Sequence, residues 1–122
     1  AYEILYRLVG SEMCIRERRN IEQIDQLNDL KNKFNLVISD LAPNLTGISS
    51  IDEENVFELN LLTLEGAIRF LESNGIFIVK TFQNSNLKKF RKEMEKNLKI
   101  VQTAKPAASK KQSKEIYLYG IK

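Results

Sequence analysis

The chain has 122 residues, which fits one small domain, and 43% of them are hydrophobic, which argues against wholesale disorder. With no histidine and one cysteine, histidine-based catalysis and an internal disulfide are excluded, and a metal site is not expected. No apolar run approaches the roughly 20 residues that span a bilayer, and the first ten residues lack a secretory signal. We therefore expect a cytoplasmic protein without a membrane partner. The formal net charge of +3 suits a polyanionic partner without requiring one.

Hydrophobic periodicity divides the chain into alternating helices and strands. Residues 35–39 and 76–79 are apolar on both faces, as buried parallel strands are. After the helix that precedes the second of these strands, Gly75 suits the left-handed position at a helix end. The expected order is a helix (21–30), a strand (35–39), a helix (about 50–73), a strand (76–79), a helix (87–97) and two strands (98–103 and 115–121), the last at or near a sheet edge.

Strands that alternate with helices predict an α/β sheet with helices on both faces. Ligands of such sheets bind beyond the carboxyl ends of the strands. Asp40 and Lys80 each follow a buried strand, so we expect both at the same edge of the sheet. Taken singly, each residue has a simpler interpretation. Asp40 could be a turn residue, Lys80 a lysine that extends to water, and Glu115 an exposed charge at a sheet edge.

Three sequence motifs, taken together, indicate the function more strongly than these residues do singly. SDLAPNLTG, IVKTFQ and KP…S…SKEIYLYG occur in the order and at the spacing found in the FtsJ (RrmJ-type) family of ribosomal RNA methyltransferases. The resemblance covers residues 21–122 approximately. It implies an α/β fold, namely the carboxyl-terminal half of a Rossmann-like S-adenosylmethionine-dependent methyltransferase sheet.

The resemblance also implies site residues, because the active centre of this family is a lysine–aspartate–lysine–glutamate tetrad. Asp40 matches the aspartate, Lys80 the second lysine and Glu115 the glutamate, whereas the first lysine has no counterpart. Asp40 is further expected beside the methyl group of the cofactor. Lys80 would act on the ribose 2′-hydroxyl, as a base or by steering its lone pair. Without the first lysine, the two carboxylates should keep Lys80 protonated.

The implied reaction is S-adenosylmethionine-dependent methylation of an RNA ribose 2′-hydroxyl, specifically of a uridine in large-subunit ribosomal RNA. The expected partner is ribosomal RNA or the large ribosomal subunit, and the complete enzyme is expected to be monomeric. Two departures from the family pattern are Asn84, where a glycine is usual, and lysines where relatives often have arginines. These lysines are Lys105, Lys110, Lys111 and Lys114. We expect them to contact RNA phosphates; the alternative is a basic loop that is only solvated.

The first residues differ in character from the remainder. Residues 8–19, LVGSEMCIRERR, resemble a translated sequencing-adapter remnant, and residues 1–19 are expected to be a foreign leader; the alternative is a genuine amphipathic helix. Residues 20–122 would then be a partial domain without the glycine-rich cofactor loop and the first three strands of the sheet. On this interpretation the chain alone binds no S-adenosylmethionine appreciably and is inactive. Its strand at 35–39 has an open edge, and the expressed chain is aggregated or molten.

Other functions stay open at this point. An amino-group methyltransferase is disfavoured, because Asn44 follows Pro43 and no aromatic ring is present there to stack on a base. A non-catalytic RNA-binding fragment would use the basic loop alone. Transfer RNA and messenger cap 2′-O-methyltransferases are related branches that the sequence does not separate from the ribosomal RNA enzymes.

Overall fold

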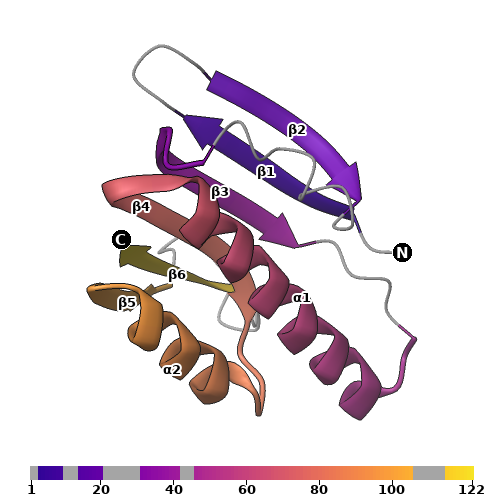
Figure 1. Cartoon of the computed structure of the whole chain (residues 1–122). Coiled ribbons are helices and arrows are strands. Elements are labelled where there is room, and N and C mark those ends of the chain that lie inside the picture. Colours follow the sequence, from indigo (N-terminus) through magenta and orange to yellow (C-terminus); the bar gives the residue numbers. More distant parts are fainter. Residues whose placement is uncertain (1–2, 10–13, 21–30, 42–45, 106–114) are drawn as a thin grey trace.

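The computed structural model describes residues 3–9, 14–20, 31–41, 46–105 and 115–122. The helix predicted for residues 21–30 lies outside these ranges. Both helices and all strands predicted within them are present (Figure 1). The helix at 87–97 and the strand at 115–121 have the predicted bounds, and the other elements have shifted ends. The elements are β1 (Glu3–Val9), β2 (Cys14–Asn20), β3 (Phe34–Leu41), α1 (Ser49–Phe70), β4 (Leu71–Phe82), α2 (Leu87–Asn97), β5 (Ile100–Ala104) and β6 (Glu115–Ile121).

The described strands form one mixed sheet in the order β2-β1-β3-β4-β6-β5. Only β3 and β4 pair in parallel, and their register sets Asp40 opposite Lys80. β6 runs antiparallel between β4 and β5, which makes it the second strand from the edge, as its alternating sequence led us to expect. The parallel pair therefore ends at one edge of the sheet, and β6 begins there.

The amino-terminal hairpin covers the edge of β3 that we expected to be open. β1 pairs antiparallel with β3 from Ile4, opposite Leu41, to Val9, opposite Leu36. β2 pairs in turn with β1 over its full length. The prediction that this edge of β3 is open is therefore wrong. The segment that was predicted to be a foreign leader supplies backbone hydrogen-bond partners for β3.

The chain passes from α1 into β4 without the predicted glycine turn. α1 ends at Phe70, and β4 begins at the next residue. The left-handed conformation is at Asn74 (φ 67°), not at Gly75, so that prediction is wrong. Asparagine tolerates this conformation better than most residues. Space around Gly75 is limited instead, since a Cβ atom there would lie 2.8 Å from Leu71 Cδ2 and 3.0 and 3.2 Å from the backbone oxygens of Glu72 and Phe34.

The core lies between the sheet and the two described helices, which are both on the same face of the sheet (Figure 1). The predicted cover of both faces is thus not seen within the described residues. From Gly75 on in β4, and throughout β6, alternate residues are buried, as the two-residue period of a strand requires. None of the described helices is long and apolar enough to cross a membrane. The fully buried core residues include Phe34, Val37, Leu59, Phe70, Phe77, Val79, Phe90, Met94 and Leu118.

Candidate active site

Three charged side chains meet at the edge of the sheet where β3 and β4 end. Lys80 Nζ lies 2.9 Å from Asp40 Oδ1 and 3.8 Å from Glu115 Oε1. Parallel pairing aligns Asp40 with Lys80, and Glu115 arrives as the first residue of β6. The structure therefore brings together the three residues that the sequence singled out. We call them the charged trio.

The carboxylates determine the protonation state of Lys80. Its side chain is 23% exposed, whereas those of Asp40 and Glu115 are about half exposed, at 48% and 47%. The hydrogen bond to Asp40 raises the pKa of Lys80, and the charges of Asp40 and Glu115 raise it further, against the opposing effect of burial. Lys80 is thus an ammonium ion at neutral pH, and the rise in its pKa has the direction that the sequence predicted.

Tyr117 belongs to the same cross-strand row, and sequence reasoning missed it. It lies opposite Lys80 in the β4–β6 register and adds to the rise in the pKa of Lys80. The signal was present in the sequence, because the alternation of EIYLYGI sets Glu115 and Tyr117 on one face of a strand. What the sequence lacked was the pairing register that brings this face beside Lys80.

A buried hydrogen bond lies on the opposite face of the sheet, next to the site. Thr81 follows Lys80 and points to the opposite face of the sheet, where it is 1% exposed. Asn60 of α1, itself 3% exposed, donates its Nδ2 hydrogen to Thr81 Oγ1 at 2.9 Å. This bond fixes α1 to β4 one residue beyond Lys80, so the strand end is held by side chains as well as by the sheet.

A pocket of about 370 Å³ opens at the same end of β4, beside the first turn of α1. Asp52 orders one wall of it by accepting hydrogen bonds from the backbone N–H groups of Thr46 (2.7 Å) and Gly47 (3.1 Å). The bonds from Thr46 lower the pKa of Asp52, so its carboxylate stays charged. The lining residues are Gly47, Ser49, Asp52, Glu53, Val56, Phe82, Gln83 and Asn84.

The predicted RNA-binding lysines fall mostly outside the described part of the chain. Lys105 directly follows β5 and is exposed. Lys110, Lys111 and Lys114 lie outside the described residues. The segment that carries them starts beside Lys105 and leads into Glu115 of the charged trio. Within the described ranges, no three histidine, cysteine or carboxylate side chains cluster as metal ligands do.

The chain has an α/β fold with the charged trio where its two parallel strands end, and comparison with known proteins gives the family. The sequence model of FtsJ-like methyltransferases matches residues 6–122. The chain therefore belongs to the FtsJ-like methyltransferase family.

Named relatives agree with this assignment. The chain is 39% identical over 102 residues to "Ribosomal RNA large subunit methyltransferase E" of Bdellovibrio bacteriovorus, covering 84% of this chain and 52% of the relative. It is 43% identical over 105 residues to the protein of the same name from Chromobacterium violaceum, covering 86% and 51%. The chain thus spans about half the length of these curated relatives.

A solved structure supports the fold. The crystal structure of a ribosomal RNA methyltransferase from Plasmodium falciparum superposes with a TM-score of 0.67 at 25% sequence identity, covering 93% of this chain and 59% of that chain. The predicted fold class, an α/β methyltransferase sheet, is confirmed.

Proposed function

We propose that this chain carries the catalytic edge of an enzyme that transfers a methyl group from S-adenosylmethionine to an RNA ribose 2′-hydroxyl. The observation that carries the proposal is the convergence of Asp40, Lys80 and Glu115 in a chain of the FtsJ-like family. The proposed substrate is a uridine of large-subunit ribosomal RNA, on the basis of the names of the relatives. The proposal includes a monomeric complete enzyme in the cytoplasm.

The protonation state of Lys80 favours one of its two predicted roles. A ribose hydroxyl is a poor nucleophile at neutral pH, so it has to be aligned with the methyl group and helped to lose its proton. A lysine with a raised pKa has no free lone pair with which to take that proton. Lys80 Nζ would instead donate a hydrogen bond to the 2′-oxygen and direct the lone pair of that oxygen toward the methyl group. As the bond between the 2′-oxygen and the methyl carbon formed, the bond from that carbon to sulfur would break, and the hydroxyl proton would pass to water at this half-exposed edge. Asp40 and Glu115 hold the ammonium group in place.

The described residues fit S-adenosylmethionine only in part. Asp40 presents a half-exposed carboxylate at the edge of the sheet, which suits a neighbour with the positive charge of a sulfonium. In Rossmann-like folds the loops after the early parallel strands hold the nucleoside part of a cofactor. On the corresponding side of β3, this chain has β1, which is antiparallel and begins at the edge of the charged trio. The cofactor would supply the activated methyl group, and most of its binding would come from segments that this chain does not provide.

The test compares the chain alone with a chimaera that joins it to the amino-terminal half of the Chromobacterium relative. Both are incubated with methyl-tritiated S-adenosylmethionine and large ribosomal subunits that lack the modification. The chimaera should label the ribosomal RNA at a nucleotide that resists alkaline cleavage, since a 2′-O-methyl group removes the attacking hydroxyl. The chain alone should transfer no label and show no saturable heat of cofactor binding in calorimetry. Label on a base rather than on a ribose would overturn the proposal.

The basic loop gives a second prediction. Replacing Lys105, Lys110, Lys111 and Lys114 by glutamine should weaken RNA binding and flatten its salt dependence. Each lysine–phosphate pair that is removed lowers the slope of log affinity against log salt by about 0.7 for a single strand, so the four substitutions together should reduce it by up to about 3 units. Fluorescence anisotropy of a labelled RNA over a salt series measures this slope. An unchanged slope would mean that the loop is only solvated.

A further inference from the structure

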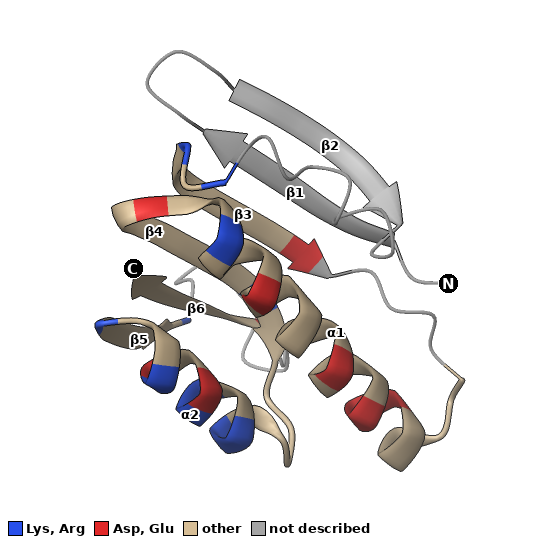
Figure 2. Cartoon of the chain, viewed as in Figure 1, with Lys and Arg blue, Asp and Glu red and all other residues tan. Residues whose placement is uncertain are grey.

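The two described helices carry opposite charges although they lie side by side. α1 bears five carboxylates against one arginine, whereas α2 bears five cations against two carboxylates. Figure 2 shows the separation as red bands along α1 and mostly blue bands along α2. A polyanion that approaches this face would be repelled by one helix and attracted by the other.

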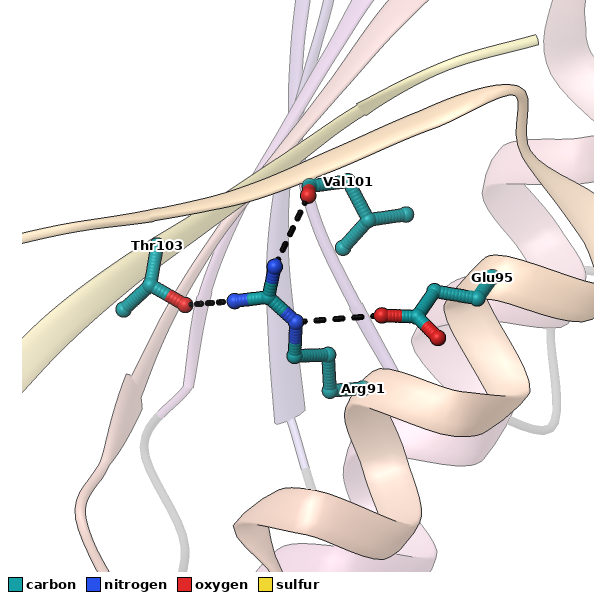
Figure 3. A network of polar contacts seen from close by, with 4 residues as sticks. All are labelled: Arg91, Glu95, Val101 and Thr103. Atoms are coloured by element: carbon teal, nitrogen blue, oxygen red, sulfur yellow. Dashed lines mark hydrogen bonds and ion pairs between the residues drawn. The ribbon is translucent and has the colours of Figure 1, made fainter.

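The cations of α2 differ in what they bind. Arg91 is fully engaged: it pairs with Glu95 at 3.1 Å and donates to Val101 O at 3.0 Å and to Thr103 Oγ1 (Figure 3). Lys96 pairs with Glu93 at 2.9 Å. The remaining three, Lys88, Lys89 and Lys92, are exposed and have no ion-pair partner among the described residues. We call these three the α2 lysine patch.

Helix stability does not explain where these lysines stand. Lys88 and Lys89 are in the first turn of α2, which contains no acidic residue. The helix dipole favours carboxylates at that end and disfavours cations, by about 0.3–1 kcal/mol each. Lys88 and Lys92 are also four residues apart, a spacing at which like charges repel. These lysines oppose the local preferences of a helix and gain no ion pair in return within the described part of the chain. Residues of this kind are expected where a protein binds something.

The first turn of α2 lies at the same end of the sheet as the charged trio, whose side chains project from the face that the two helices do not cover. β4 carries Lys80 and leads, through residues 83–86, directly into the first turn of α2. Arg91 fastens this part of α2 to the end of β5 through Val101 and Thr103. Lys105, the first residue of the basic loop, follows two positions after Thr103. The patch therefore lies near Lys105, on the side of the molecule that α1 does not occupy.

We infer that Lys88, Lys89 and Lys92 bind the phosphates of RNA next to the methylated nucleotide, so that the strand leaves the charged trio over α2 and away from α1. The inference rests on the proposed function, which supplies the RNA. Lysine suits this task because it provides charge without reading sequence. Arg91 acts as a positioning residue, because its three bonds hold α2 in one orientation against β5.

The test measures the affinity of the chain for a labelled single-stranded RNA of mixed sequence across a salt series. Replacing Lys88, Lys89 and Lys92 together by alanine should lower the log–log slope by about 2 units, which corresponds to three phosphates at about 0.7 each. Replacing the same three by arginine should retain the slope, because charge rather than shape is required. Alanine favours helix, so loss of α2 is not a competing explanation; far-ultraviolet circular dichroism checks this.

A matched control removes equal charge from the opposite end of the sheet. Lys31, Lys33 and Lys99 are exposed, and the last two precede the first residues of β3 and β5. Their triple alanine variant should keep the slope of the unaltered chain. Equal slopes for the two triple variants would mean that only net charge matters and would overturn the inference, as would an unaltered chain that binds no RNA. The methylation assay on the chimaera decides the proposed function separately, since it reports on chemistry rather than on the path of the strand.

Discussion

Replacing Lys80 by alanine in the completed chimaera should lower methyl transfer by about 10²–10³-fold, which is the usual cost of removing one preorganised hydrogen-bond donor from the reacting oxygen. Cofactor affinity should change little, because Lys80 is assigned to the ribose hydroxyl. Asp40→Ala should impair both transfer and cofactor affinity, since Asp40 is expected beside the methyl group. Single-turnover rates and cofactor titrations separate the two effects. Near-normal turnover by the Lys80 variant would remove its assigned role.

Lys33→Ala provides the control, because Lys33 is an exposed lysine at the other end of β3. Its transfer rate should equal that of the unaltered chimaera. If Lys33→Ala and Lys80→Ala reduced activity equally, general charge rather than the trio would be responsible.

The pH dependence of the trio follows from the same interactions. Because Asp40 raises the pKa of Lys80, Asp40→Asn should lower that pKa, which a carbon-detected NMR titration of the lysine Cε measures in the chain alone. A raised pKa in the folded state stabilises the fold below the ordinary lysine value of about 10.4. That contribution disappears as pH rises through the higher folded value. An unchanged pKa in the variant would show that the 2.9 Å pair does not form in solution.

The sequence predicted the trio well because its geometry follows from a general rule of parallel sheets. Asp40 and Lys80 each end a buried strand, and two parallel neighbours must present such residues at one edge. Glu115 required more, since only the family pattern connected it with the others. Tyr117 was missed because an antiparallel register depends on tertiary pairing, which local alternation does not reveal.

The errors have the same physical origin. The hydrophobic pattern of residues 35–39 showed a strand that needs neighbours but not which segment provides them. Residues 2–9 are apolar enough to cover this edge, but only tertiary pairing decides that β1 does so. Gly75 was predicted to have a positive φ because it is a glycine at an expected helix end. Asn74 takes that conformation instead, and at Gly75 the nearby backbone oxygens of Glu72 and Phe34 leave little room for a side chain. Local sequence identifies elements, whereas contacts between elements decide such details.

The covered edge also changes what to expect of the chain in solution. The predicted aggregation rested on an open β3, and β1 pairs along that edge. We therefore expect the chain to unfold cooperatively in urea. Tyrosine fluorescence and circular dichroism are the appropriate probes, because the sequence has no tryptophan.

Phe77→Ala should bring a large loss of stability. Phe77 is 0% exposed on β4, the strand between β3 and β6, and its ring packs into the core under the helices. Removing a buried phenylalanine ring usually costs about 3–5 kcal/mol, from reduced burial and from the cavity left behind. Small domains are stable by only about 5–15 kcal/mol, so this change can consume most of the margin.

The neighbouring residue supplies the control for this prediction. Ile76 is on the same strand but points to the other face and is 39% exposed. Ile76→Ala should therefore shift the urea midpoint by less than half as much as Phe77→Ala, whereas Phe77→Leu, which retains much of the buried volume, should fall between them. Equal midpoints for the two alanine variants would mean that the layer between sheet and helices is not the core. A shift for Phe77→Ala alone would establish that this face of β4 supports the strand end that carries Lys80.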